Sequence, residues 1–399
     1  MGGFADFQSQ IYRAGLDGER PALPLGADEL ELAASRVMAP EVYGYVAGSA
    51  GSEATARANR RAFDAWALVP RHLRGITTRD LSLDLWDSHL AGPVLLAPIG
   101  ALGAVREGAE LEAARAVRAL GLPLVLSTLS STTLEEVAQE LGHTGAEVAA
   151  ADAAPAWFQL YWPTDREIAE SLVRRAQAAG YQALVVTVDT FTLAWRPRDL
   201  GNAYLPFHHA EGLANYFSDP VFRSRLAEPP EADPAAAVGY WGDIFSHPAL
   251  SWKDLAWLRQ LTTLPILLKG ICHPDDARQA GALGVDGLIV SNHGGRQVDG
   301  ARAALDCLPE VVAAAGGLPV LFDSGVRCGP DVLKALALGA RAALLGRPFV
   351  YGLALAGQRG VEHVLRCLLA ELELTLVLCG RRSLAELDRS LLVPAHPPA

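Results

Sequence analysis

The sequence predicts one large α/β domain of the (β/α)8, or TIM, barrel class. Short apolar segments recur along the chain, amphipathic stretches separate them, and the apolar runs do not alternate with polar residues. Such unbroken runs are typical of parallel strands covered on both faces. An open doubly wound sheet could also hold eight strands, but eight units in series over roughly 260 residues favour a closed barrel. The expected strands are residues 93–97, 123–126, 156–160, 183–187, 265–268, 287–290, 319–322 and 342–345.

Helices are expected between these strands. Residues 166–180, 274–284 and 330–339 all end at a glycine, and the second and third begin with proline. Proline suits the first helical position because its missing N–H would have no partner there, and glycine suits the position just past the last turn. The chain therefore repeats a strand–helix unit.

These repeats divide the chain into three parts. We expect residues 1–90 to form an N-terminal helical extension packed on the barrel, residues 91–380 to form the barrel, and residues 381–399 to form a C-terminal tail. The connection 199–251, between the fourth and fifth strands, is far longer than a usual strand–helix connection. Connections of that length are commonly active-site lids or disordered segments, and we expect a lid.

Composition predicts a soluble globular protein of the cytoplasm. Half of the 399 residues are hydrophobic (50%), which is enough for a large core. No window approaches the roughly 18 unbroken apolar residues of a membrane span, and the first ten residues lack the order of a signal peptide. A net charge of −11 without a dense Lys/Arg block argues against a nucleic acid or an anionic membrane as partner.

No metal site is expected. The pair His208–His209 has no third ligand at suitable spacing and is expected on the lid surface. The cysteines are odd in number, widely spaced and free of CxxC motifs, so we expect reduced thiols. They are Cys272, Cys307, Cys328, Cys367 and Cys379.

The segment Ser291–Gln297 places a base beside an anion-binding side chain. His293 and Arg296 lie within it, after the apolar run 287–290 and next to two glycines. An imidazole beside a guanidinium suits proton abstraction from an anionic substrate. The alternative is a glycine-rich turn with a solvated arginine.

Polar residues follow almost every expected strand. In a barrel these strand ends meet on the one face where active sites are built. Capping of the next helix would explain Ser127 or Thr187 singly, but it explains Lys269 and Asp323 poorly. The polar strand-end residues are Ser127, Thr128, Gln159, Tyr161, Thr187, Asp189, Lys269, Ser291, His293, Asp323 and Arg347.

Two neighbouring strand ends predict a phosphate site. Gly325 and Arg327 follow the seventh strand, and Gly346 and Arg347 follow the eighth. Glycines let backbone N–H groups approach a phosphate, helix N-termini add partial positive charge, and arginines donate in pairs. No GxxxxGK[ST] motif is present, which argues against a nucleoside triphosphate. The phosphate and a buried Lys269, which could stabilise a reduced flavin, together suggest FMN and a 2-hydroxy acid.

From about Asp28 to Leu391 the chain resembles the FMN-dependent 2-hydroxy-acid oxidising enzymes, the group of glycolate oxidase, lactate oxidase, mandelate dehydrogenase and lactate 2-monooxygenase. The most specific segments are Ser291–Gln297, Asp323–Arg327 and Lys334–Ala340 leading into Gly346-Arg347-Pro348. The resemblance implies a (β/α)8 barrel with FMN at its mouth, assembled as a homotetramer or homo-octamer.

The resemblance also implies residue roles. His293 matches the base that takes the α-hydroxyl proton, or the α-proton in a carbanion mechanism, and Asp189 matches its carboxylate partner. Lys269 and Tyr161 match groups beside the flavin and the substrate hydroxyl. The substrate-carboxylate clamp matches Arg196, Arg296 and Tyr45, with Tyr161 nearby. The matched cofactor contacts are Pro98, Ile99, Gly100, Ser127, Gln159, Thr187, Lys269, Ser291, Asp323, Gly325, Arg327, Gly346 and Arg347.

Within the family, residues 195–222 and 269–276 look most like lactate 2-monooxygenase. The resemblance therefore implies oxidation of an L-2-hydroxy acid, above all L-lactate, with O2 reoxidising the FMN, and a plain 2-hydroxy-acid oxidase is the alternative. A closed lid would keep pyruvate beside newly formed peroxide, which would decarboxylate it to acetate and CO2. A looser lid would release keto acid and H2O2, as an oxidase does. We expect Gly100 to leave room for oxygen beside the flavin.

Two departures from the family pattern concern the pocket. Ser49 replaces a glycine that is usual after the Tyr45 signature, and Leu129 stands where several relatives have an aromatic residue. A bulkier 2-hydroxy acid than lactate is therefore an alternative substrate. Two other classes also stay open. They are another FMN barrel enzyme, which would not need His293 beside Arg296, and a non-catalytic flavin-binding protein.

Overall fold

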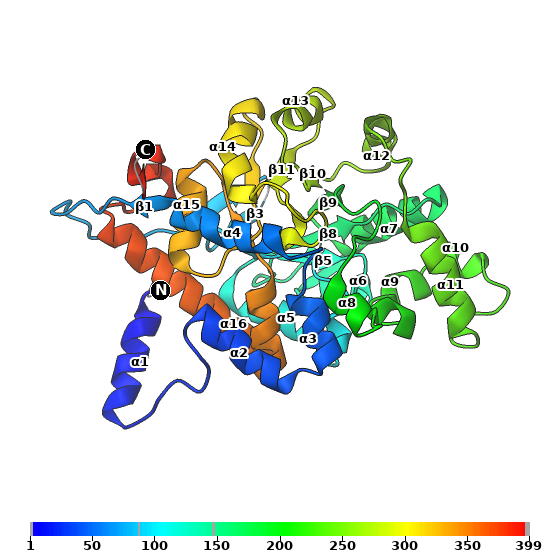
Figure 1. Ribbon diagram of the computed structural model, residues 1–399, viewed down its shortest axis with the longest axis horizontal. Helices are drawn as coiled ribbons and strands as arrows, with labels where there is room; N and C mark the ends of the chain where they lie inside the picture. The colour runs from blue at the N-terminus through cyan, green and yellow to red at the C-terminus, as the bar shows by residue number, and fades with distance from the viewer. Residues whose placement is uncertain (1–2, 87, 146–147, 396–399) are drawn as a thin grey trace.

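The computed structural model describes residues 3–86, 88–145 and 148–395, and its centre is a closed barrel of eight parallel strands (Figure 1). Each strand coincides with one of the eight apolar runs, so the predicted barrel is confirmed. The last strand pairs with the first, Ala343 opposite Val94, which closes the sheet. In barrel order the strands are β4 (Val94–Leu96), β5 (Leu124–Ser127), β8 (Ala156–Leu160), β9 (Ala183–Thr187), β10 (Ile266–Lys269), β11 (Gly287–Val290), β12 (Val320–Phe322) and β13 (Ala343–Leu345).

Side chains fill the inside of the barrel. Leu95, Trp157, Leu267 and Ile289 belong to one buried cluster within it, and alternate residues such as Leu96 pack outward against the helices. A hairpin, β2 (Leu83–Leu85) with β3 (Ser88–Leu90), adds its leucines to the inner cluster. Because the interior is packed, a ligand site must lie at the carboxyl ends of the strands.

Helices surround the strands, and the three predicted from proline and glycine positions are present. The chain leaves α7 through Gly180, whose φ of 95° is a left-handed conformation that glycine adopts without strain. The helix α16 is the longest and is interrupted at Ala356 and Gly357. The outer helices are α5 (Ala109–Leu120), α6 (Leu134–Glu140), α7 (Arg166–Ala179), α12 (Leu255–Leu261), α13 (Pro274–Ala282), α14 (Ala304–Ala314), α15 (Gly329–Ala337) and α16 (Arg347–Leu378).

Four helices precede the barrel. They are α1 (Asp6–Leu16), α2 (Ala27–Val37), α3 (Pro40–Ala47) and α4 (Ala54–Asp64). Figure 1 shows α1 projecting from the body, and none of its residues is buried. The C-terminal segment returns to this region, because β14 (Leu392–Pro394) pairs with β1 (Trp66–Leu68). A small hairpin of β6 (His143–Gly145) and β7 (Val148–Ala149) completes the strands.

The segment between β9 and β10 folds into short helices, which lie together at one side of the barrel (Figure 1). Tyr216 and Phe222 within it are fully buried, and Asn215 donates to the carbonyl of Thr128 at 3.1 Å. These contacts fix the segment to the end of β5. Ahead of the outer helix α12, its elements are α8 (Pro197–Gly201), the 3-10 turn η2 (Pro206–His209), α9 (Ala214–Phe217), α10 (Pro220–Ser224), α11 (Pro234–Phe245) and the 3-10 turn η3 (Trp252–Asp254).

None of the helices in the described ranges combines the length and the apolar character that crossing a membrane requires.

Candidate active site

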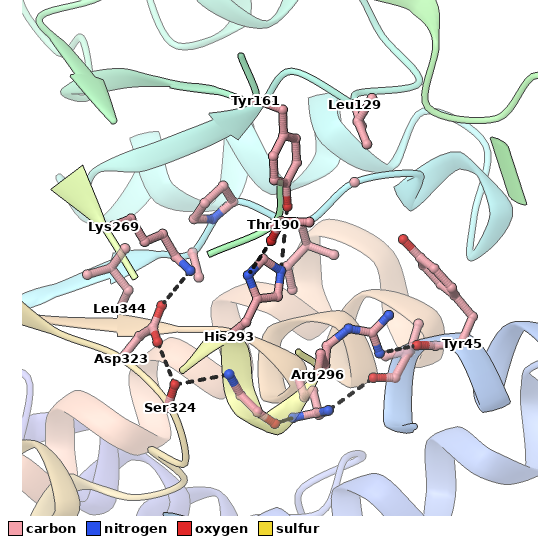
Figure 2. Close-up of a pocket in the computed structure, with 18 of the residues that line it drawn as sticks. Tyr45, Leu129, Tyr161, Thr190, Lys269, His293, Arg296, Asp323, Ser324 and Leu344 are labelled. Carbon is pink, nitrogen blue, oxygen red and sulfur yellow. Dashed lines mark hydrogen bonds and ion pairs between the residues drawn. The ribbon is translucent and has the colours of Figure 1, made fainter. Parts of the chain in front are cut away.

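A cavity opens at the carboxyl ends of the barrel strands (Figure 2). Most of the predicted site residues line it, although they come from distant parts of the chain. Ser127, Gln159, Thr187, Asp189 and Ser291 are not in its lining. The predicted residues that line it are Tyr45, Pro98, Ile99, Gly100, Tyr161, Arg196, Lys269, His293, Arg296, Asp323, Gly325, Arg327, Gly346 and Arg347.

His293 and Asp189 form a hydrogen-bonded pair. Nδ1 of His293 lies 2.8 Å from Oδ1 of Asp189. Both side chains are largely buried, with 16% and 14% exposed. A carboxylate at Nδ1 holds the tautomer in which that nitrogen carries the proton, so Nε2 is left as a free base. Tyr161 lies on this side, with its hydroxyl 3.5 Å from Nε2.

The protonation states of this pair leave the His293 imidazole neutral and able to accept a proton. Burial lowers the pKa of His293, and the nearby Asp189 carboxylate offsets this only in part. Burial would raise the pKa of Asp189, but the charge and hydrogen bond of His293 and the charge of Lys269 bring it to about 2. Near neutral pH the pair is therefore a neutral imidazole beside a carboxylate. Burial raises the pKa of Tyr161 to about 12, so its phenol keeps its proton.

Thr190 is a member of this group to which sequence reasoning gave no role. Its hydroxyl donates to Oδ1 of Asp189 at 2.9 Å and lies 3.2 Å from Nδ1 of His293. Thr190 also lines the cavity, as Figure 2 shows. Its position directly after Asp189 was visible in the sequence, but its contact with the imidazole depends on how the chain turns after β9.

The loop that bears His293 is held in an unusual conformation. His293 has a φ of 58°, which is the left-handed region that side chains other than glycine seldom adopt. The N–H of His293 donates to the Ser291 hydroxyl at 3.0 Å, and that of Gly294 donates to the Ser324 hydroxyl at 3.0 Å. These bonds tie the loop to the ends of β11 and β12, and the imidazole is thereby aimed into the cavity.

Lys269 is a buried cation at the end of β10. Its Nζ lies 3.2 Å from Oδ2 of Asp323 and donates to the Ser291 hydroxyl at 3.1 Å. Burial opposes the charge, but Asp323 and Asp189 raise the pKa of Lys269 above its ordinary value. A lysine held as a cation can stabilise negative charge that develops on a neighbouring ligand.

Two predicted flavin contacts have polar atoms without a protein partner. Nε2 of Gln159 and Oγ1 of Thr187 are buried and make no hydrogen bond within the described residues. The side-chain oxygen Oε1 of Gln159, by contrast, accepts from the Ser127 hydroxyl at 3.0 Å. This bond fixes the orientation of the side-chain amide. An unpaired buried polar group costs about 1–3 kcal/mol. These atoms fit a ligand with hydrogen-bonding groups along one edge, as the flavin ring of FMN has.

The predicted carboxylate clamp is assembled on one side of the cavity. The Arg296 guanidinium lies 5.0 Å from the centre of the Tyr45 ring and donates to the carbonyls of Tyr45 and Gly48, at 2.6 and 2.8 Å. Arg196 donates from Nε to the Arg296 carbonyl at 3.1 Å. Burial and the charge of Arg296 lower the pKa of Arg196 to about 10. Two cations forced together in a buried place favour an anion between them.

Gln297 supports the clamp, although sequence reasoning gave it no role. Its Nε2 donates to the carbonyls of Asp189 and Thr192, at 2.7 and 3.0 Å. Its Oε1 accepts from Nη2 of Arg196 at 2.9 Å. The amide therefore joins the clamp to the segment that carries the catalytic pair. Its place in the segment Ser291–Gln297 indicated that Gln297 lies near the site. Its partners could not be predicted, because Asp189 and Thr192 lie in a loop without a repeating sequence pattern.

The two arginines predicted to hold phosphate differ in their contacts. Arg347 uses four of its five N–H donors within the protein. They go to the carbonyls of Val46, Gly48 and Gly294 and to the Ser49 hydroxyl, at 3.0, 2.8, 3.1 and 2.9 Å. Ser49, which stands where the family usually has glycine, therefore accepts a hydrogen bond from Arg347.

Arg327 keeps most of its donors free. The structure gives its guanidinium one hydrogen bond, to the Val326 carbonyl at 2.9 Å. The neighbouring Gly325 has a φ of 100°, and a Cβ there would lie 3.0 Å from the carbonyl oxygen of Asn59. A phosphate beside Gly325 would therefore be bound mainly by Arg327, and Arg347 mainly joins α3 to the His293 loop.

The expectation for Gly100 needs correction. A Cβ on Gly100 would lie 3.0 Å from Cβ and 3.1 Å from the carbonyl oxygen of Leu129, and 3.7 Å from the Phe207 ring. The missing side chain thus makes way for Leu129 rather than leaving a space for oxygen. Gly100 still lines the cavity with its backbone.

No metal site is found within the residues that the structure covers, where no three His, Cys, Asp or Glu side chains come together as ligands would. His209 stacks on Tyr204, with ring centres 5.5 Å apart.

Known proteins are similar to this chain in sequence and structure over nearly its whole length. Residues 34–394 match the family model described as FMN-dependent dehydrogenase. The chain is 43% identical to an FMN-dependent alpha-hydroxy acid dehydrogenase of Penicillium citrinum, over 97% of this chain and 95% of that one. It is 44% identical to an L-lactate oxidase of Lysinibacillus sphaericus, over 93% of each chain. A crystal structure of mandelate oxidase superposes with a TM-score of 0.80 at 37% identity, covering 93% of this chain and 98% of that one. The chain therefore belongs to the FMN-dependent dehydrogenase family, whose cofactor is FMN and whose members named here act on 2-hydroxy acids.

Proposed function

We propose that the protein oxidises L-2-hydroxy acids, with L-lactate as the simplest substrate, and that O2 reoxidises its FMN. The observation that carries the proposal is the free Nε2 of His293, which faces the same cavity as Arg296. A base beside a carboxylate clamp suits removal of a proton from C2 or its hydroxyl. The relatives named L-lactate oxidase support both the substrate and the acceptor.

In this proposal Arg296, Arg196 and Tyr45 bind the substrate carboxylate. His293 takes a proton through Nε2, and Asp189 stabilises the imidazolium that results. Tyr161 donates to the substrate oxygen from its protonated phenol. FMN, when bound, accepts the two electrons that leave C2. Gln159, Thr187, Ser291 and Lys269 would hold its ring, Asp323 its ribityl chain, and Gly325, Arg327, Gly346 and Arg347 its phosphate.

A monooxygenase outcome, giving acetate, CO2 and water, is the second candidate. It is supported by the folded segment between β9 and β10, which places the buried rings of Phe207 and Phe245 in the cavity wall. A closed wall would keep pyruvate near peroxide long enough for decarboxylation. The relatives named L-lactate oxidase instead support release of keto acid and H2O2.

One aerobic assay tests both candidates. Turnover of L-lactate is followed by oxygen uptake, and pyruvate, H2O2 and acetate are measured together. Pyruvate and H2O2 in equal amounts would identify an oxidase, and acetate in their place a monooxygenase. If no 2-hydroxy acid gave oxygen uptake, the proposed function would be wrong.

We also propose that the protein is a homotetramer or homo-octamer. Tyr12 and Leu16 on the projecting helix α1 are 71% and 86% exposed, and contact with a second copy would bury them. Light scattering coupled to size exclusion would give the mass, and a monomer would contradict the proposal.

A further inference from the structure

Three aromatic residues of the segment between β9 and β10 join the two phenols of the site. We call Phe207, Trp241 and Phe245 the aromatic belt. The Phe207 ring packs edge-on against Tyr45 at 6.2 Å between centres, and Trp241 lies 5.2 Å from Phe207. Phe245 lies 5.0 Å from Trp241 and 5.5 Å from Tyr161. A continuous row of rings thus runs from Tyr45 to Tyr161.

The belt is a built feature of the fold. Trp241 and Phe245 stand one turn apart on α11, which begins at Pro234. The Asp233 carboxylate accepts from the Ala236 N–H at 3.0 Å at this end of the helix. The other end of α11 is fastened by the Ile244 carbonyl, which accepts from the Thr164 N–H at 2.8 Å. All three rings are buried, and Phe207 and Phe245 line the cavity while Trp241 does not.

Phe207 is positioned by two glycines. A Cβ on Gly212, whose φ is +81°, would lie 3.1 Å from Cε1 of Phe207, and one on Gly100 would lie 3.7 Å from the same atom. Side chains at these positions would crowd the ring. The backbone therefore fits closely around Phe207, which holds the ring at the cavity wall.

The ends of the belt coincide with the two polar anchors of the site. Tyr45 lies beside Arg296, where a carboxylate would bind, and Tyr161 lies 3.5 Å from Nε2 of His293, where C2 would react. A 2-hydroxy acid that reaches both anchors lies alongside the row of rings. Its remaining substituent on C2 then faces Phe207 or Phe245.

We propose that the aromatic belt binds the side chain of the substrate and restricts the enzyme to 2-hydroxy acids with an apolar side chain, aliphatic or aromatic. This inference rests on the proposed function. The two belt rings that line the cavity, Phe207 and Phe245, offer no hydrogen-bond donor, so a second carboxylate would lose its hydration against them without compensation. A hydrogen in place of the side chain, as in glycolate, would leave the rings without contact.

The test compares kcat/KM for L-lactate, (S)-mandelate and L-malate in the wild type and in variants at Phe245. The wild type should use lactate and mandelate at least about tenfold better than malate. Phe245→Ala removes a ring from the wall, so the methyl group of lactate loses contact while a phenyl group gains room. The ratio of mandelate to lactate should then rise roughly tenfold.

The milder variant Phe245→Leu should move this ratio in the same direction, and it keeps the test valid if Phe245→Ala does not fold. Phe217→Leu is the matched control, because Phe217 lies in the same segment but does not line the cavity. Bound FMN, read from the visible spectrum, shows that each variant is folded.

A ratio that stays within twofold in folded Phe245 variants would overturn the inference, as would a wild type that prefers malate. In both cases the enzyme still turns over 2-hydroxy acids. Absence of turnover with every 2-hydroxy acid would instead overturn the proposed function, so the two failures are distinguishable.

Discussion

The imidazole of His293 and the carboxylate of Asp189 are joined by a 2.8 Å contact between Nδ1 and Oδ1. Nε2 lies on the cavity side, next to the Tyr161 hydroxyl (Figure 2). β9 delivers Asp189 and β11 delivers His293, so the pair exists only because the barrel brings the ends of these strands together. The contact fixes the proton on Nδ1 and makes Nε2 the base.

Asp189→Asn tests this pair through its pH dependence. Protonation of His293 removes the base, so the rate of FMN reduction should fall as the pH drops through the pKa of His293, which burial places below 6.5. Loss of the carboxylate removes the interaction that raises this pKa, so the acidic limb should move to lower pH. The maximal rate should fall about 10²-fold or more, because the imidazolium is no longer stabilised. Stopped-flow reduction between pH 4.5 and 8 would measure both effects, and an unchanged limb would exclude His293 as the titrating base.

Lys269→Met tests the buried cation beside the flavin site. The variant keeps an unbranched apolar side chain that is one atom shorter, and it leaves Asp323 without its partner at 3.2 Å. Reduction of FMN by L-lactate should slow by about 10²-fold, because negative charge on the reduced ring loses its stabilising cation. The reduction potential of bound FMN should also fall. If the rate and potential both matched the wild type, Lys269 would have only a structural role.

Arg327→Leu and Arg347→Leu should have different effects. Arg327 has most of its donors free, so its loss should weaken FMN binding by tenfold or more, about 1.4 kcal/mol or more. Arg347 binds α3 and the His293 loop, so its loss should chiefly raise KM for the 2-hydroxy acid by displacing Tyr45. Fluorescence titration with FMN measures the change in FMN binding, and steady-state kinetics measure the change in KM. The reverse pattern would show that Arg347 is the main phosphate ligand.

Gly100→Ala should destabilise the protein. A Cβ at this position would lie 3.0 Å from Cβ and 3.1 Å from the backbone oxygen of Leu129. Neither atom can move without a shift of the Leu129 backbone. Overpacking of this kind costs about 1–3 kcal/mol. Urea denaturation of the variant would show this loss. Equal stability of Gly100→Ala and the wild type would mean that this region is looser than described.

The barrel could be predicted because each strand is a short apolar run, and almost every run is followed by a polar residue. The same regularity led to His293, Lys269 and Asp323, which directly follow or end a strand. Phe207 and Phe245 could not be predicted, because they lie in a segment whose short helices have no repeating pattern. The role of Arg347 could not be predicted either, because its partners are mainly the backbone carbonyls of Val46, Gly48 and Gly294, and no residue spacing encodes them.

Anaerobic reduction of the bound FMN tests the central claim most directly. The purified protein should be yellow and should bleach when L-lactate is added without oxygen. His293→Ala should keep the colour, because the residue is not needed to bind FMN, and should lose the bleaching. A wild type whose flavin is not reduced by any 2-hydroxy acid, or a His293→Ala variant that bleaches as fast as the wild type, would contradict the account.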